Sequence, residues 1–368
     1  MKEYLLKEIA NVKNGYAFDS SKYSDKGIPI IRIADIKDNI DLSKCVCIDE
    51  EINKEFLIKK GSLLIALSGA TTGKMSVFSD NKIAYLNQRI CSIYTKNEDI
   101  SQEFLIYFLK SIQKKIIVNS YGGAQPNISS KWIENIKIKV PNIKIQKKIS
   151  KKLELLANNI NSRKSQLVFL KELTKSLFTT MFGDIKTNDK NWEIYYWKDV
   201  LNIKNGKNQK QVEDINGKYP IYGSGGIIGR SNAYICNENS IIIGRKGNIN
   251  KPILVKEKFW NVDTAFGLEV KSEKMSYHYL YYFCLFYDFE IHNKAVTIPS
   301  LVKSDLEKIV LPVPPIELQN KFAERVEKIE KLSFEIEEAI KEAENLYNSL
   351  ISKYFDWYPK NYHLDILG

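Results

Sequence analysis

The sequence predicts an α+β fold with two similar domains of short strands and helices. These are separated by two long antiparallel coiled-coil helices, in a pseudo-two-fold internal repeat. Three observations predict it: the chain repeats itself, the late part of each repeat has heptad spacing, and the two heptad segments differ in charge. The length of 368 residues suits about two domains, and 44% hydrophobic residues are enough to bury their cores.

The internal repeat is seen in matching segments that stay in order along the chain. Leu6–Gly15 resembles Trp197–Gly206 at an offset of 191 residues, and the offset then falls to 178 and 175. From Pro126, matched by Pro299, the offset stays at 173 to the end of the repeat. The early parts of the two copies therefore differ in length, whereas the length of the late part is constrained.

The late part of each copy has apolar residues at alternating steps of four and three. Neither stretch contains Gly or Pro, and a 3.5-residue period sustained over about five heptads indicates a coiled coil. A single buried amphipathic helix is the alternative, although ~35 residues is long for one. The predicted seam consists of Ile149, Leu153, Leu156, Ile160, Leu167, Leu170, Leu177 and Met181 in the first copy, and Phe322, Val326, Ile329, Ile336, Ile340, Ala343, Tyr347, Leu350 and Tyr354 in the second.

Charge indicates that these two helices pair with each other. Residues 141–183 carry nine basic and two acidic groups, whereas residues 316–368 carry seven basic and eleven acidic groups. Opposite charge favours the mixed pair over self-pairing, so part of the net charge of +11 is used inside the molecule. Chain connectivity makes the pair antiparallel. At ~1.5 Å per residue we expect the helices to hold the two globular units about 50–55 Å apart, as in a dumbbell.

Short apolar runs and two aromatic segments predict the secondary structure of the globular units. Leu63–Leu67 and Ile241–Ile243 are flanked by Gly or Asn-Ser, which is typical of buried strands. Ile136–Val140 and Ile309–Val313 lead through prolines into the long helices, and the predicted aromatic helices are Phe104–Ser111 and Tyr277–Phe286.

The sequence offers few candidates for catalysis. Gly69–Lys74 has three residues between its glycines and Met75 after the lysine, whereas a phosphate-binding P-loop needs four residues and then Ser or Thr. Cys45 and Cys47 have no second cysteine pair or nearby histidine to complete a zinc site. Asp305–Lys308 partly resembles the Glu-x-Lys pattern of a nuclease carboxylate cluster but lacks the intervening residue. We interpret it as a solvated helix start. We therefore expect no enzyme activity, no metal and no bound cofactor.

Polar and aromatic loops that occur in both copies predict DNA binding. Arg and Lys pair with guanine and Asn or Gln with adenine, while backbone amides and Lys hold phosphates. For any one residue a solvated turn is the simpler interpretation; the paired occurrence of the loops favours function. The candidate DNA contacts are Ser68, Thr71, Thr72, Lys74, Arg89, Tyr121, Gln125 and Asn127 in the first copy, and Tyr222, Ser224, Arg230, Arg245, Lys246, Asn248, Asn261 and Thr264 in the second.

Taken together, these features make the chain resemble the specificity (S) subunit of type I restriction–modification systems. The resemblance covers essentially the whole chain and includes the repeated Lys-Asn-Gly opening and the segment Tyr219–Gly226. It also includes the helix entries Val140–Gln146 and Val313–Gln319, where only the Gln of the family's usual Glu-Gln pair is present.

The resemblance implies a division of labour along the chain. Residues 1–142 and 184–315 would be target recognition domains, each reading one half of a bipartite site in double-stranded DNA. Residues 143–183 and 316–356 would be coiled-coil helices that set the spacer and dock two modification (methyltransferase) subunits, with restriction/motor subunits joining through them. Residues 357–368 would form a C-terminal tail. S-adenosylmethionine and ATP would belong to the partner subunits.

Two other functions stay open on the sequence alone. One is a coiled-coil interaction or oligomerisation protein whose heads bind other proteins. The other is a stand-alone DNA-modifying enzyme with an unrecognised site. Five scattered cysteines and the lack of a long apolar run predict a cytoplasmic protein without a disulfide framework.

Overall fold

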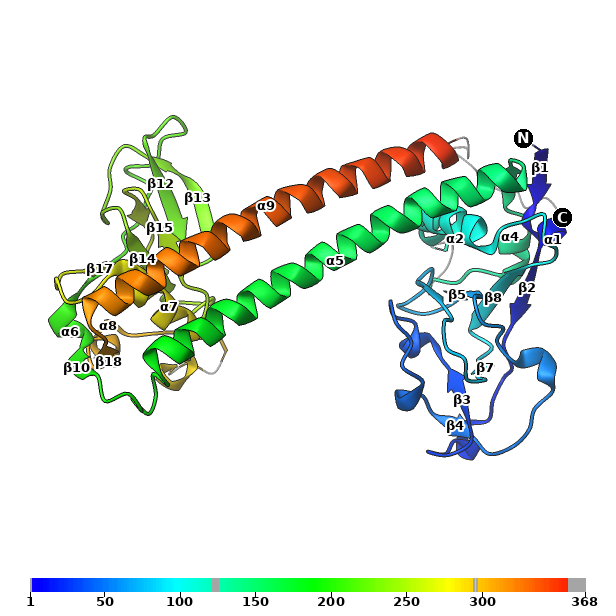
Figure 1. Ribbon diagram of the computed structural model, residues 1–368, viewed down its shortest axis with the longest axis horizontal. Coiled ribbons are helices and arrows are strands. Elements are labelled where there is room, and N and C mark those ends of the chain that lie inside the picture. Colours follow the sequence, from blue (N-terminus) through cyan, green and yellow to red (C-terminus); the bar gives the residue numbers. More distant parts are fainter. Residues whose placement is uncertain (1, 121–125, 294, 296, 357–368) are drawn as a thin grey trace. The chain divides into compact units, whose positions relative to one another are not determined.

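The computed structural model describes residues 2–120, 126–293, 295 and 297–356. The chain forms two compact units, of which unit 1 is Met1–Ser162 with Ile340–Gly368 and unit 2 is Arg163–Ala339. Each unit holds one globular head and part of both long helices, α5 (Ile143–Phe182) and α9 (Ile316–Phe355) (Figure 1). The predicted tail, residues 357–368, lies outside the described residues.

The described residues of the head of unit 1 (head 1) form three small sheets and four α-helices. An antiparallel sheet has the order β2 (Ala10–Asn14), β8 (Ile90–Thr95), β5 (Leu63–Ala66) and β6 (Met75–Val77). A second sheet has the order β4 (Cys47–Ile48), β3 (Ile28–Ile31) and β7 (Tyr85–Leu86), in which β3 and β7 are parallel. β1 (Lys2–Leu5) pairs with β9 (Lys137–Val140). The helices are α1 (Leu6–Ile9), α2 (Gln102–Ser111), α3 (Gln113–Val118) and α4 (Ser130–Glu134), with 3₁₀ turns at Ser20–Lys22, Ile33–Asp35, Leu42–Lys44 and Lys54–Phe56.

The head of unit 2 (head 2) repeats this topology strand by strand. Its antiparallel sheet has the order β11 (Leu201–Asn205), β17 (Ala265–Val270), β14 (Ser240–Gly244) and β15 (Ile253–Val255). The second sheet has the order β13 (Gly226–Ser231), β12 (Tyr219–Gly223) and β16 (Trp260–Asn261), with β12 and β16 parallel. β10 (Glu193–Tyr196) pairs with β18 (Val310–Val313). The helices are α6 (Trp197–Val200), α7 (Tyr277–Phe286) and α8 (Lys303–Leu306), with a 3₁₀ turn at Phe289–His292.

Local sequence explains the central elements of both heads. β5 is apolar along its whole length and β14 has three consecutive isoleucines after Ser240, in keeping with the burial of both faces of each strand. The predicted aromatic helices are confirmed as α2 and α7, and each begins after a serine N-cap. The Ser101 hydroxyl accepts from the N–H of Phe104 (3.3 Å), and that of Ser276 from the N–H of Tyr279 (3.1 Å). The predicted α+β class and the internal repeat are therefore confirmed.

Each head core also contains parts of both long helices, and this shows how the helices run. In head 1 the ring of Phe355, at the end of α9, lies 5.4 Å from that of Phe104, and Ile149 near the start of α5 joins the same core. In head 2 the ring of Phe182, at the end of α5, lies 4.9 Å from Tyr279 and 5.0 Å from Phe322 near the start of α9. The start of one helix therefore lies beside the end of the other in both units, so α5 and α9 are antiparallel, as predicted.

Burial separates the predicted seam from the other apolar residues of the long helices. Every seam residue is buried or half-buried. Other apolar residues near the helix ends, Phe178, Phe182 and Phe355 among them, are buried in the head cores. Eight apolar residues outside the seam are more than 40% exposed; these are Ile145, Leu155, Val168, Phe169, Leu173, Leu332, Phe334 and Leu346. The two helices thus bury one stripe and leave other apolar side chains in solvent. No helix in the described part of the chain is both long and apolar enough to cross a membrane.

Candidate nucleic-acid interface

Four loops meet around Leu67 in head 1. The Leu67 N–H donates to the carbonyl oxygen of Arg89 (2.8 Å), and the Leu67 carbonyl accepts from the N–H of Ile128 (2.8 Å). Two residues on, the N–H of Gly69 donates to the carbonyl of Pro126 (3.2 Å). A β-carbon built on Gly69 would lie 3.6 Å from Cδ1 of Ile33, which places the loop after β3 beside the others. We call residues 32–33, 68–74, 87–89 and 126–128 the head-1 loop cluster.

Head 2 builds the same arrangement around Arg245. Its N–H donates to the carbonyl of Thr264 (2.8 Å), and its carbonyl accepts from the N–H of Leu301 (2.9 Å). The N–H of Gly247 donates to the carbonyl of Pro299 (2.9 Å), and a β-carbon on Gly247 would lie 3.9 Å from Oγ of Ser224. Residues 223–226, 245–248, 262–264 and 299–301 are the head-2 loop cluster. These three backbone hydrogen bonds correspond one to one in the two clusters.

The side chains on this shared backbone differ between the heads. Isolated bridges pair Ser68 with Asn127 in head 1 and Lys246 with Ser300 in head 2, at equivalent positions. Arg89 likewise corresponds to Thr264. The two clusters thus present different donors, acceptors and charges from the same scaffold.

Most of the predicted contacts in the described chain reach the surface of these clusters. The exposed side chains carry charged and amide groups, and the other side chains are half-buried. The exposed residues are Lys74, Arg89, Asn127, Lys246 and Asn248; the half-buried ones are Ser68, Thr71, Ser224, Arg245 and Thr264, with half-buried Tyr222 next to the head-2 cluster. The Arg245 guanidinium lies over the Phe266 ring, 5.8 Å from its centroid, so a cation–π contact orients it.

Three of the predicted contacts take part in the fold instead. The Asn261 side chain is fully buried and donates to the Ala265 carbonyl (3.0 Å). The Thr72 hydroxyl is buried and donates to the carbonyls of Gly69 (2.6 Å) and Pro126 (3.1 Å). Asn261 and Thr72 thus shape the loops from inside, which corrects their expected role as base readers.

The third is Arg230, whose exposed side chain bonds to the backbone. Its Nε donates to the carbonyl of Gly217 (2.6 Å) and Nη2 to that of Lys218 (2.8 Å). The guanidinium therefore braces the β12–β13 hairpin. Two further predicted contacts, Tyr121 and Gln125, lie outside the described residues.

An apolar pair near the tip of the β12–β13 hairpin was missed by the sequence reasoning. Ile227 and Ile228 are 62% and 55% exposed, immediately after Gly226. A β-carbon on Gly225 would lie 3.6 Å from Nδ2 of Asn248, so this turn lies beside the head-2 loops. The segment Tyr219–Gly226 just before them was visible in the sequence, but only the structure shows that the two isoleucines after it face solvent.

The glycine-rich loop Gly69–Lys74 has no free cradle for a phosphate. The N–H groups of Gly69, Thr72, Gly73 and Lys74 all donate to carbonyl oxygens of the protein. A P-loop needs such amides pointing at the ligand and a helix after them, whereas strand β6 follows here. The nucleotide-binding interpretation therefore fails on geometry.

Two buried cysteine thiols in the heads have raised pKa values and are unsuited to catalysis. Burial raises the pKa of Cys91 to about 12, and burial with the nearby Glu269 carboxylate raises the pKa of Cys236 to about 12. Such thiols stay protonated at neutral pH and are poor nucleophiles. Among the residues that the structure describes, no group of three or more His, Cys, Asp or Glu is arranged to hold a metal.

Comparison with known proteins supplies an independent view of the same chain. The family model described as "Type I restriction modification DNA specificity domain" matches residues 1–169 and 189–344. The MjaVIII specificity subunit of Methanocaldococcus jannaschii is 24% identical, and the match covers 76% of this chain and 75% of that protein. The EcoBI specificity subunit of Escherichia coli is 21% identical, with 94% of this chain and 84% of that protein covered.

Solved structures show the same fold. The S subunit of a type I restriction-modification system from M. genitalium superposes with a TM-score of 0.66 at 17% sequence identity, covering 98% of this chain and 96% of that one. A chain from a study of complex assembly in a type I R-M system gives a TM-score of 0.55 at 14% identity and covers 96% and 97% of the two chains.

Proposed function

Because the chain belongs to the type I restriction-modification DNA specificity family, whose members are non-catalytic specificity subunits, we propose how it divides that task. Each head reads one half of a bipartite site in double-stranded DNA. The long helices set the spacer between the halves and dock two methyltransferase subunits, through which restriction/motor subunits join. S-adenosylmethionine and ATP are then bound by those partners.

The observation that carries this proposal is the pair of loop clusters. The same backbone hydrogen bonds support both, yet equivalent positions differ, as Arg89 and Thr264 or Ser68 and Lys246 do. A scaffold kept constant under changing polar side chains is what two readers of different base sequences require. The two half-sites should therefore differ in sequence.

The exposed groups of each cluster suit the edges of bases and the DNA backbone. Arg89 can donate two hydrogen bonds to guanine, and Asn127 or Asn248 can pair with adenine. Lys74 and Lys246 carry charge toward phosphates. Ile227 and Ile228 offer an apolar contact of the kind that recognises a thymine methyl group.

Exposed apolar side chains outside the seam support docking on the long helices. Within unit 2, Val168, Phe169, Leu332 and Phe334 are 55%, 67%, 45% and 64% exposed. Solvent-facing aromatic and aliphatic side chains on helices that already bury another stripe are typical of protein interaction sites. The repeated heads and helices favour two copies of one partner.

Selection from a library of random double-stranded DNA tests the function. The full chain, alone and co-purified with its methyltransferase partner, should enrich two different short sequences at one fixed spacing. Affinity should fall steeply with salt, because phosphate contacts release counterions. The enrichment of no sequence, or binding insensitive to salt, would contradict DNA reading and favour a protein-interaction role. Methyltransferase or nuclease activity of the purified chain alone would favour the stand-alone enzyme.

A further inference from the structure

Two glutamines occupy the same place at the starts of the two long helices. Gln146 is the fourth residue of α5 and Gln319 the fourth of α9, and their side chains are 1% and 0% exposed. A buried amide must form hydrogen bonds to offset its lost hydration. Their partners therefore show what each glutamine holds in place.

Both amides make the same three hydrogen bonds. Oε1 of Gln146 accepts from the N–H of Ser101 (2.8 Å), and Nε2 donates to the carbonyls of Asp99 and Pro141 (2.9 Å each). In head 2, Oε1 of Gln319 accepts from the N–H of Ser276 (2.8 Å), and Nε2 donates to the carbonyls of Lys274 (2.9 Å) and Pro314 (2.7 Å). We call each set a glutamine clamp.

Each clamp glutamine accepts a hydrogen bond from the N-cap N–H of a head helix that is distant in sequence. An N-cap N–H is often bonded by a Glu or Gln side chain three residues on, in a capping box. In α2 and α7 that position holds Phe104 and Tyr279, which cannot accept the bond. The glutamine of the long helix accepts it instead, across 45 residues in head 1 and 43 in head 2. The long helix is thereby bonded to the head helix, to the loop before it and to its own entry.

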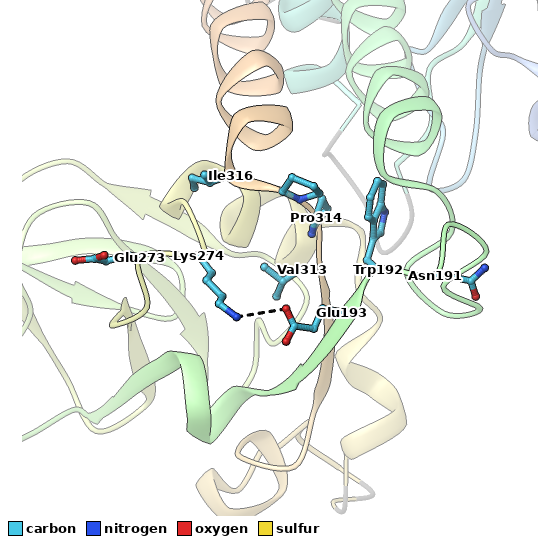
Figure 2. A pocket seen from close by; sticks show the side chains of 9 residues that line it. Asn191, Trp192, Glu193, Glu273, Lys274, Val313, Pro314 and Ile316 are labelled. Carbon is cyan, nitrogen blue, oxygen red and sulfur yellow. Dashed lines mark hydrogen bonds and ion pairs between the residues drawn. The ribbon is translucent and has the colours of Figure 1, made fainter.

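A surface hollow lies beside each clamp, at the point where the chain enters the long helix. In head 2 the hollow is about 350 Å³, and Figure 2 shows Lys274, Val313, Pro314 and Ile316 around it, with the Lys274–Glu193 ion pair (3.4 Å) on one side. In head 1 a hollow of about 590 Å³ is lined at equivalent positions, among them Asp99, Val140, Pro141 and Ile143.

The residues whose carbonyls receive each clamp thus also form the wall of a hollow. Beside each hollow the clamp therefore bonds the head to the first turn of its long helix.

We propose that Gln146 and Gln319 are positioning residues that fix the orientation of each head on its long helix, and so set how strictly the protein measures the DNA spacer. This inference rests on the proposed function. A head free to pivot would still read its half-site, because the loop clusters do not include the clamp. It would, however, accept half-sites at more than one spacing.

The test compares spacer tolerance in clamp variants of the full chain. Gln146→Met and Gln319→Met, together, keep side-chain length but remove every amide hydrogen bond; Gln166→Met, at an exposed position of α5, is the matched control. The probe is the library of random duplexes. Wild type and Gln166→Met should enrich one spacing, whereas the double variant should enrich the same two half-sequences at two or more spacings.

Each other outcome of the selection has a separate meaning. A single unchanged spacing in the double variant would overturn the positioning role. Altered half-sequences would also overturn it, since the glutamines would then act in reading. If wild type enriches no bipartite sequence, the proposed function itself fails, whatever the clamp does.

Hydrogen exchange in the single variants tests the clamp even if the double variant does not fold. In Gln146→Met alone, exchange of the Ser101 amide should accelerate at least about tenfold while that of Ser276 stays unchanged, because a buried N–H loses its acceptor in one head only. The converse holds for Gln319→Met. Equal exchange at Ser101 in wild type and Gln146→Met would show that the clamp holds nothing, and would overturn the proposal.

Discussion

Leu67 and Arg245 make the same two backbone hydrogen bonds in different heads, one through the N–H and one through the carbonyl. Leu67 points its side chain into the core of head 1, whereas the Arg245 side chain lies half-buried over Phe266. The backbone at this position therefore accepts both an aliphatic and a cationic side chain. The side chain at this position can therefore differ between the heads while the backbone hydrogen bonds of the surrounding loops stay the same.

Replacement of Arg245 by the residue found at the equivalent position tests this separation. Arg245→Leu should leave thermal stability within about 0.5 kcal/mol, since head 1 shows leucine on the same backbone. Binding to the selected DNA should weaken by about 1–3 kcal/mol, with relaxed preference at the bases read by head 2. Fluorescence anisotropy with duplexes mutated in one half-site measures the affinity and the base preference. Lys321→Leu, which removes an exposed charge from α9, is the control, and an equal loss in that variant would mean only that net charge matters.

The repeat, both long helices and the aromatic head helices could be predicted because they leave local periodic signals. The 173-residue offset after Pro126 and the seam from Ile149 to Met181 needed no knowledge of the fold. The parallel pairing of β3 with β7 and of β12 with β16 left no such signal, because it joins segments about 40–55 residues apart through backbone groups. Tertiary register of this kind is set by the whole core.

The candidate site was predicted in its loops but not in the roles of single residues. Asn261 looks like a polar loop residue in the sequence, and only the structure shows its amide bonded inside the head. Gln146 and Gln319 were visible as a repeated match, yet two of the three hydrogen-bond partners of each lie more than 40 residues away. The repeat showed that a glutamine recurs at this position, and the structure shows the hydrogen bonds that both glutamines make.

One repeated glycine has a cause that can be tested directly. A β-carbon on Gly206 would lie 1.8 Å from the carbonyl oxygen of Val262, and one on Gly15 would lie 2.0 Å from that of Leu86. Gly206→Ala must push backbone apart and should cost about 3 kcal/mol or more of head-2 stability. Gly223→Ala, whose β-carbon would meet side chains at 3.7 Å, is the matched control and should be close to neutral. Urea unfolding followed by tryptophan fluorescence compares them, and equal stability of the two variants would contradict the close approach.

Thiol chemistry should distinguish the folded chain from the unfolded one. All five cysteines are free and buried, and burial raises the pKa of Cys45 to about 11 and that of Cys91 to about 12. Ellman's reagent at pH 8 should therefore find no fast thiol in the native protein and five after unfolding in urea. A Ser79→Cys variant, at an exposed loop position, should react at once and serves as the positive control. A native thiol that reacts as fast as this control would contradict the burial.

The same pKa shifts fix the sign of the alkaline pH dependence. The folded state holds these protons above the ordinary thiol pKa of 9.0, at which the unfolded chain begins to lose them. Stability should therefore be unaffected below about pH 8 and fall as the pH rises from 9 toward 12. Urea midpoints measured across this range check the direction, and a midpoint that rises above pH 9 would contradict it.

The length of the long helices should appear in the DNA spacer. Ala157 and Ile160 of α5 face Glu344 and Tyr347 of α9 around a shared hollow, which fixes the antiparallel register in unit 1. Removal of residues 156–162 together with 342–348 therefore deletes one heptad from each helix and keeps the seam aligned. The helices shorten by about 10 Å, so the enriched spacer should shorten by about three base pairs with both half-sequences unchanged.

Rotation adds a second expectation for this paired deletion. A heptad changes the facing of a helix by only about 20°, whereas three base pairs carry about 100° of duplex twist. The shortened protein should thus bind its new site more weakly than wild type binds its own, because the DNA must twist to meet both heads. Deletion of 156–162 alone should misalign the seam and lower stability without defining any new spacer. An unchanged spacer in the paired deletion would show that the helices do not measure it.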